Sequence, residues 1–279
     1  MTTMTHTPDH TPDFTMHPAA GLPEHVSLAD TLSQTMTMAW RATLKMRRNF
    51  EQFFDVTIQP LLFTAMFAYI FGGAVSGDVS SYLPILIPGL IAQTVLTACV
   101  ATGVQLREDM DKGVFDRFRV LPISRIAPLA GPMVADTIRY AIAATLTFAT
   151  GIAMGYRPGG GFGGVFAAVV LAIIAGWSLA WVFTWFGTVG KSAQVVQGYS
   201  LMVMFPLTFL SNAFVPASTL PDWLQAFVKV NPVSHVVSAV RSLANQGQFT
   251  SEVGWSFLGF AIVIAIFAPL SVRSFKQKI

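Results

Sequence analysis

Six apolar segments, each close to 20 residues long, constrain this chain more than any other feature. They cover residues 56–75, 83–106, 138–156, 165–188, 195–215 and 253–272, and Arg139 is the only charged residue inside them. A helix of about 20 residues crosses the roughly 30 Å apolar core of a bilayer. Charged residues make up 11% of the chain, against about 25% in ordinary soluble domains. The pattern predicts an all-α polytopic membrane protein with six transmembrane helices.

The basic residues are distributed unevenly between the two sides of this arrangement. Arg157, Lys229 and Arg241 fall on one side, and most of the 17 Lys and Arg residues fall on the other. That second group contains Arg41, Lys45, Arg47, Arg48, Arg107, Lys112, Arg117, Arg119, Arg125, Lys191, Arg273, Lys276 and Lys278. Cytoplasmic connections carry such an excess because positive residues resist translocation. We therefore expect both termini in the cytoplasm. Since topology explains the basic residues, the pI near 9.2 does not indicate a nucleic-acid partner.

Two segments precede the first predicted span. Residues 1–30 are rich in Thr, Pro, His and Asp and contain no basic residue, which predicts a disordered cytoplasmic tail. Residues 31–53 predict an amphipathic helix lying in the lipid headgroup layer, since apolar and basic side chains fall on opposite faces. The apolar face holds Leu32, Met36, Trp40, Met46, Phe50 and Phe53, and the basic face holds Arg41, Lys45 and Arg48. The remainder, 54–279, is predicted to be a single membrane domain.

The segment 216–248 interrupts the simple pattern of long apolar spans. Three prolines divide it, and it contains charged residues and two stretches of helical periodicity, 222–230 and 232–244. Both helices are too short and too polar to cross a bilayer. We predict a re-entrant or surface helix pair on the outer face, between the fifth and sixth spans.

The connection 107–125 combines a high density of charge with an apolar edge. Glu108, Asp109 and Asp111 open it, and Val114, Phe115, Phe118 and Leu121 recur at helical spacing. A short helix with aromatic residues and flanking Arg is suited to docking in a groove of another protein. Spacing alone leaves a solvated connecting loop equally open.

The run from Lys112 to Pro122 resembles the coupling-loop signature of the type-2 ABC export permease family. This run reads Lys112-Gly113-Val114-Phe115-Asp116-Arg117-Phe118-Arg119-Val120-Leu121-Pro122. Segments 55–60, 69–74, 205–212 and 231–235 also resemble that family, and the similarity extends from about Trp40 to the C-terminus. The resemblance implies six spans in a bacterial cell membrane and a dimer with a second copy or a homologous permease. It also implies outward transport of an amphiphilic compound, energised by a soluble ATPase that docks on the run Lys112–Arg119. Glu108, with Asp109 and Asp111, is expected to help register a basic patch on that ATPase.

The resemblance also implies that the partner, and not this chain, uses ATP and Mg²⁺. Gly190-Lys191-Ser192 is the only hint of a phosphate-binding loop, and a Walker A motif requires Gly where this chain has Trp185. The chain is therefore expected to bind no cofactor and to have no enzymatic activity of its own.

Several residues inside the predicted spans are candidates for pairing or for a substrate path. Asp136 and Arg139 lie three apart and can pair on one helix face. Arg139 is expected at the cytoplasmic interface, where a structural pair is favoured over substrate recognition. Helix packing and stacking of a planar substrate remain alternatives for the aromatic and soft side chains. These are Trp177 and Trp181, in a row with Trp185, together with Met202, Phe205 and Phe209.

His235 follows Pro232 in the outer helix pair, and an alternative function of the chain depends on this residue. A lone His without a nucleophile or acid nearby is seldom catalytic, so helix capping or hydrogen bonding is the favoured role. A membrane enzyme that modifies lipids, with His235 as its base, is the alternative. That enzyme would turn over without an ATPase.

Overall fold

The computed structural model describes residues 27–48, 50–114 and 127–278, and these residues form helices joined by short connections without a strand. The predicted all-α fold is therefore confirmed for the described residues. The helices are α1 Leu28–Arg48, α2 Phe50–Ser76, α3 Val79–Ala98, α4 Val100–Asp111, α6 Ala127–Ala153, α7 Gly161–Val189, α8 Ala193–Phe209, α9 Asp222–Val230, α10 Pro232–Gln246 and α11 Ser251–Lys278, with a 3₁₀ turn at Ala217–Thr219. Residues 1–26, most of the predicted tail, lie outside the described part.

Among the described residues, four helical stretches are long and apolar enough to cross a membrane: Thr57–Ser76, Val79–Asp111, Gly161–Val189 and Ser251–Phe275. Helices α6 and α8 fall outside this set. α6 has 27 residues, but it contains Asp136 and Arg139, which reduce its apolar character. α8 has 17 residues, about 26 Å at 1.5 Å each, slightly less than the bilayer core. The count of six spans therefore stays a prediction.

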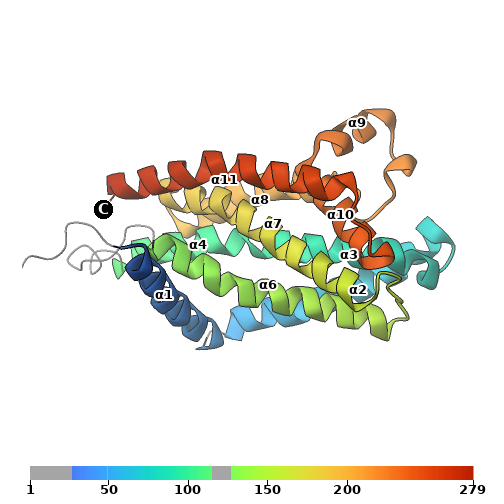
Figure 1. The fold of residues 1–279 in the computed structure, drawn as a ribbon, viewed down its shortest axis with the longest axis horizontal. Coiled ribbons are helices and arrows are strands. Elements are labelled where there is room, and N and C mark those ends of the chain that lie inside the picture. The colour runs from blue at the N-terminus through green and yellow to red at the C-terminus, as the bar shows by residue number, and fades with distance from the viewer. Residues whose placement is uncertain (1–26, 49, 115–126, 279) are drawn as a thin grey trace, which may run out of the picture.

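The long helices run side by side as a bundle with two distinct ends (Figure 1). α1, the end of α4 and the C-terminal end of α11 lie at one end, and α9 and α10 lie at the other. The two ends of the described chain thus share one side of the bundle, as the basic residues predict. We call that side the inner end and the α9–α10 side the outer end.

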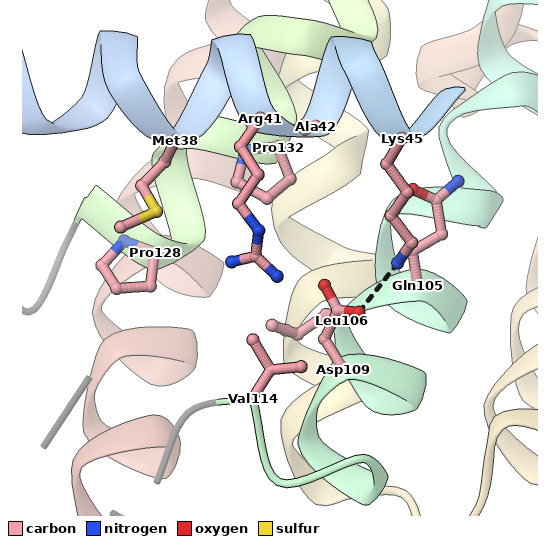
Figure 2. A pocket seen from close by; sticks show the side chains of 10 residues that line it. All are labelled: Met38, Arg41, Ala42, Lys45, Gln105, Leu106, Asp109, Val114, Pro128 and Pro132. Atoms are coloured by element: carbon pink, nitrogen blue, oxygen red, sulfur yellow. Dashed lines mark hydrogen bonds and ion pairs between the residues drawn. The ribbon is translucent and has the colours of Figure 1, made fainter. Parts of the chain in front are cut away.

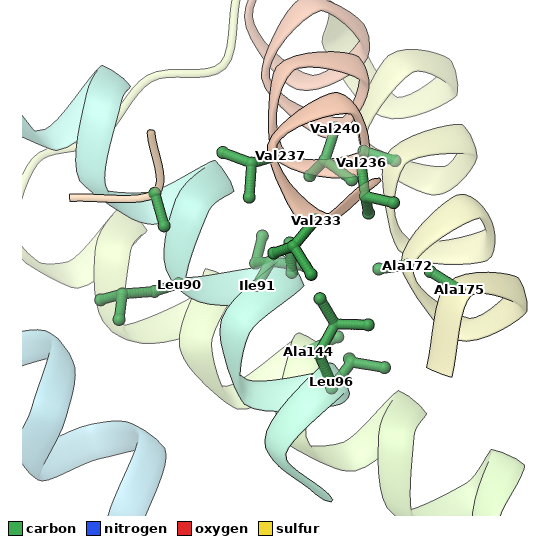
Figure 3. Packing of buried hydrophobic residues seen from close by; sticks show 14 of the residues in the cluster. Leu90, Ile91, Leu96, Ala144, Ala172, Ala175, Val233, Val236, Val237 and Val240 are labelled. Atoms are coloured by element: carbon green, nitrogen blue, oxygen red, sulfur yellow. The ribbon is translucent and has the colours of Figure 1, made fainter. Parts of the chain in front are cut away.

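α3 lies at the centre of the bundle and has the most completely buried face. Figure 3 shows Leu90, Ile91 and Leu96 of α3 packed among side chains of α6, α7 and α10. Small residues make this close packing possible: a Cβ on Gly176 of α7 would lie 2.8 Å from Val95 Cγ1. Helices pack in membranes largely through such close contacts, since burial from lipid supplies little hydrophobic driving force.

The two outer helices occupy different environments. α10 is capped by Asn231, whose side chain accepts a hydrogen bond from the Val233 backbone N–H, and Pro232 begins its first turn. Val237 and Val240 of α10 are fully buried, within the apolar cluster that includes α3 and α7. α9 instead projects from the outer end of the bundle (Figure 1) and buries only Val228. The helices occur where the sequence predicts them, and α10 is a core element rather than a surface one.

Candidate functional site

α3 and α4 together form an arm that reaches from the core of the bundle to its inner end. Only Cys99 separates them, and the combined stretch Val79–Asp111 has 33 residues. At about 1.5 Å per residue it is about 50 Å long, well beyond the roughly 30 Å of a bilayer core. The predicted coupling loop begins at the inner end of this arm.

The charged side chains at the end of α4 pair along the helix itself. Glu108 and Lys112 form an ion pair of 3.2 Å, and Arg107 pairs with Asp111 one turn away. Gly113 then adopts a φ of 66°, a left-handed conformation that favours glycine and ends the helix. The acidic cluster seen in the sequence is therefore largely neutralised within α4.

A small pocket lies between α1, α4 and α6 beside the start of the coupling loop (Figure 2). Lys45 of α1 donates to Asp109 of α4 across 2.7 Å and so ties the two helices together. The side chain of Arg41 points into the same pocket. The lining is completed by Met38, Ala42, Gln105, Leu106, Val114, Pro128 and Pro132. Basic residues of α1 therefore face the inner ends of α4 and α6.

The opposite side of α1 carries an apolar stripe that is exposed in the part of the chain that the structure describes. Leu32, Met36, Trp40 and Leu44 recur at intervals of four, and Trp40 is 66% exposed. Such a stripe suits a helix lying in the headgroup layer. Met38 and Ala39 instead pack closely against Gly131 of α6.

Phe115, Asp116, Arg117, Phe118 and Arg119 of the predicted coupling loop lie outside the described residues. Their docking role stays a prediction.

Asp136 and Arg139 form an ion pair of 3.0 Å that is buried, not exposed at an interface. Arg139 is 3% exposed and Asp136 is 6% exposed. The sequence predicts a span that begins near residue 138, which would place Arg139 at its inner end. α6 begins at Ala127 and continues through Pro132, so Arg139 lies twelve residues, about 18 Å, inside the helix. The pair is therefore enclosed by the bundle, and its position at the cytoplasmic interface of the membrane stays a prediction.

This buried pair holds the junction of α3 and α4 through two hydrogen bonds that sequence patterns do not predict. Arg139 Nη2 donates to the Ala98 carbonyl across 2.8 Å, and the Thr102 hydroxyl donates to Asp136 Oδ2. Both partners lie beside Cys99, where α3 passes into α4. The cluster thus sits at the junction of the arm, within the bundle.

The tryptophan row of α7 faces different neighbours along its length. Trp177 is partly exposed, and its indole Nε1 donates to Thr137 of α6 across 3.0 Å. Trp181 packs against the main apolar cluster, and Trp185 meets Phe267 of α11 edge-on, with ring centroids 5.7 Å apart. These contacts join α7 to α6 and to α11, as a packing role requires.

Met202, Phe205 and Phe209 lie on an exposed face of α8. Phe205 stacks on Phe209 at 4.3 Å, Phe209 lies 5.4 Å from Phe214, and Phe214 lies 4.5 Å from Phe67 of α2. The stack runs from the exposed rings of α8 to the buried rings of Phe214 and of Phe67 in α2. Sequence reasoning missed Phe67 and Phe214, since neither lies at helical spacing from the α8 residues.

His235 has an acidic partner that the sequence analysis did not anticipate. Its Nδ1 lies 2.6 Å from Glu252 Oε2 at the start of α11, and its ring lies 6.2 Å from that of Trp255. Glu252 is 17 residues away and reaches His235 only because the chain turns between α10 and α11. Asn231 caps α10, so the geometry supports hydrogen bonding, and not helix capping, as the role of His235.

Polar side chains of α10 also hold the outer end of α3. Pro88 lacks the N–H that would bond the Pro84 carbonyl, and Asn245 Nδ2 donates to that carbonyl across 2.8 Å. Arg241 Nη2 donates to Ile85 O at 3.1 Å and to Asn212 O at 2.8 Å. Burial lowers the pKa of Arg241 to about 10. Among the described residues, no group of three His, Cys, Asp or Glu side chains is placed to hold a metal ion.

Comparison with known proteins identifies the class to which this arrangement belongs. Residues 33–244 match the ABC-2 type transporter family, so the chain belongs to that family. It is 38% identical over 255 residues to the daunorubicin resistance ABC transporter permease protein DrrB1 of Streptomyces coeruleorubidus, covering 91% of this chain and 90% of that one. It is 24% identical to a probable doxorubicin resistance ABC transporter permease protein, DrrC, of Mycobacterium tuberculosis, over 86% and 88% of the two chains. A putative transport permease of Pyropia yezoensis is 26% identical over 75% of this chain and 70% of its own.

Proposed function

We propose that this chain is the membrane subunit of an ATP-driven exporter, energised by a separate ATPase that docks on the loop 107–125. The observation that carries the proposal is the arm formed by α3 and α4. It begins in the outer half of the bundle, passes through the buried core and ends where the loop starts. A force applied at the inner end is therefore transmitted directly to buried helices. ATP and Mg²⁺ are used by the partner and not by this chain.

The exposed face of α8 supports pairing with a second permease subunit. Gln194 and Gln197 are exposed there, together with Met202 and Phe205. Amide side chains are costly to leave in contact with hydrocarbon, whereas a protein partner or a water-filled path can satisfy them. The exposed face of α11 instead carries apolar residues such as Ile262 and Ile266, as contact with lipid requires. We therefore place a second copy, or a homologous permease, against α8.

The proposed topology has six spans in the bacterial cell membrane, with α6 and α8 added to the four apolar stretches. α6 packs within the bundle, and its two charges face each other, which lowers the cost of placing them in a membrane. The shared end of α1 and α11 is assigned to the cytoplasm because of its basic residues. α9 and α10 then lie at the outer face.

The proposed cargo is an amphiphilic, drug-like compound or a lipid. Phe205 and Phe209, at the exposed end of the aromatic stack, offer ring faces next to exposed Met202. Planar aromatic compounds bind such surfaces by offset stacking. Relatives named for resistance to daunorubicin and doxorubicin are consistent with a compound of that kind.

The docking step is tested by changing Phe115 and Phe118 to Ala together and measuring both pull-down of the cognate ATPase and ATP-dependent export. We expect both to fall about tenfold or more, since buried aromatic residues dominate such interfaces. Phe162 and Phe166, exposed at the outer end of α7, provide a matched double-Ala control. Undiminished association and export in the Phe115/Phe118 variant would reject the docking assignment.

The alternative, a membrane enzyme that modifies lipids, gains one supporting observation, the pairing of His235 with Glu252. A carboxylate that orients an imidazole is part of many acid–base sites. The hydrogen bonds found in the described part of the chain join no Ser or Cys nucleophile to the His235 ring. The alternative predicts lipid turnover by the purified chain without an ATPase, abolished by His235→Ala. Absence of turnover alongside ATP-dependent export would exclude it.

A further inference from the structure

The arm formed by α3 and α4 departs from regular α-helix at Cys99, where the two helices meet. The Thr102 N–H bonds to Cys99 O at 3.2 Å, three residues back, instead of to Ala98 O, four residues back. The Ala98 carbonyl therefore accepts no hydrogen bond from Thr102, and it accepts one from Arg139 Nη2 at 2.8 Å instead. A tightened turn within a long helix often marks a hinge. A side chain inserted into the hydrogen-bond ladder is a recognised cause of bending.

Helix α4 is held on two sides immediately below this departure. On the α6 side, the Thr102 hydroxyl donates to Asp136, the partner of Arg139. On the α7 side, a Cβ on Gly103 would lie 2.1 Å from Phe183 O, and a Cβ on Gly187 would lie 2.5 Å from Gly103 O. α4 therefore rests against the backbone of α7 and is attached by polar groups to α6. Its twelve residues extend from this point to the inner end.

We propose that Asp136 and Arg139 are positioning residues that form the pivot on which α4 turns when the ATPase moves the coupling loop. This inference rests on the proposed function and assigns that function's mechanical step to named groups. α4 is about 18 Å long, so a tilt of about 10° at Cys99 moves its inner end by about 3 Å. Because Arg139 and Asp136 hold the residues on either side of Cys99, the tilt is transmitted to α6 as well as to α3.

The composition of the cluster supports a role beyond packing. A buried ion pair is replaced by apolar residues of similar volume in many proteins without loss of stability. Charged residues within membrane spans are rare and are associated with function. Arg139 Nε, moreover, is buried without a hydrogen-bond partner. The guanidinium thus retains a donor that can engage a second carbonyl once α4 has tilted.

The test uses the full chain assembled with its cognate ATPase in proteoliposomes and measures compound exported per ATP hydrolysed. The decisive variant is Asp136→Leu with Arg139→Met, which removes both charges and keeps the volume. We expect it to insert, bind the ATPase and hydrolyse ATP, while export per ATP falls about tenfold. Thr147→Val is the matched control, since Thr147 is buried on α6 and its hydroxyl bonds only the Ala143 carbonyl of its own helix. We expect that control to keep the wild-type ratio.

A second variant, Thr102→Val, keeps the buried pair and removes only its hold on α4. We expect export per ATP to fall about threefold, and spin labels at positions 112 and 191 to show a smaller ATP-driven distance change. If the double variant fails to insert, the Thr102→Val result tests the pivot on its own. Wild-type export per ATP in every variant that inserts would overturn the pivot, whereas absence of ATP-dependent export by the wild-type protein would overturn the proposed function instead.

Discussion

Replacing Gly103 with Ala tests whether α4 and α7 are in backbone contact, which the arm requires. The added Cβ would lie 2.1 Å from Phe183 O and 2.6 Å from its carbonyl carbon. An ordinary contact of this kind is about 3.4 Å or more, so the helices must separate by roughly 1 Å. The obstructing atoms are backbone and no rotamer change relieves them. Overpacking of this type costs about 1–3 kcal/mol.

Gly73→Ala is the matched control, because Gly73 lies within α2 and a Cβ there meets nothing within 4 Å. Ala in an open helical position is favoured over Gly by about 0.5–1 kcal/mol. Because the same helical preference applies to Gly103, the two Gly→Ala variants should differ by the cost of overpacking, about 1–3 kcal/mol in unfolding free energy, with Gly103→Ala the less stable. Denaturant unfolding in detergent measures the difference. Equal stability of the two variants would refute the close approach of α4 to α7.

Three further predictions concern Arg241 at the outer end, Lys45 at the inner end and Asp78 before the start of α3. Arg241→Met leaves buried carbonyls without a donor, at a cost of about 1–3 kcal/mol, so hydrogen exchange in α10 should accelerate about tenfold; unchanged exchange would contradict this. Lys45→Gln should lower stability by at most about 1 kcal/mol, because its pair with Asp109 is partly exposed; a loss of several kcal/mol in thermal unfolding would be inconsistent with that exposure. Hydrogen bonds from Ser81 lower the pKa of Asp78, so its stabilisation is present above the unfolded value of 3.8 and is lost as the pH falls through the lower folded value. Asp78→Ala should accordingly lower the melting temperature at pH 7 and have no effect at a pH well below 3.8.

The sequence predicts those features that depend on local pattern. The apolar spans, the stripe of Leu32, Met36 and Trp40, and the helices of the outer pair all follow from hydrophobic periodicity and from proline positions. Their side chains point in directions that the helix period alone determines. The family relationship likewise follows from short runs of adjacent residues.

The features that the sequence does not predict involve partners distant along the chain or a backbone atom. Glu252 reaches His235 through a turn, and Arg139 bonds the backbone carbonyl of Ala98 at the end of α3, a partner that residue types do not reveal. The apolar pattern begins near residue 138, eleven residues after the start of α6, because Pro132 and Asp136 make the first turns of this helix resemble a connection. Proline is tolerated inside membrane helices because neighbouring groups satisfy the freed carbonyls.

Two arginines hold the same long helix at two heights, and together they define which part of it can move as a unit. Arg241 bonds the Ile85 carbonyl and Arg139 bonds the Ala98 carbonyl, thirteen residues or about 20 Å apart. Between Pro88 and Ala98 α3 is uninterrupted and mostly buried, so it has little freedom to bend. Pro84 and Pro88 near the outer end, and the tightened turn at Cys99 below Ala98, weaken the helix. A displacement of α4 therefore has to pass through the middle of α3 as a rigid shift or rotation, and it reaches the outer end at the carbonyls that Arg241 and Asn245 hold. If α3 instead bent in its middle, a label placed between Leu86 and Val95 would move independently of both ends when ATP binds.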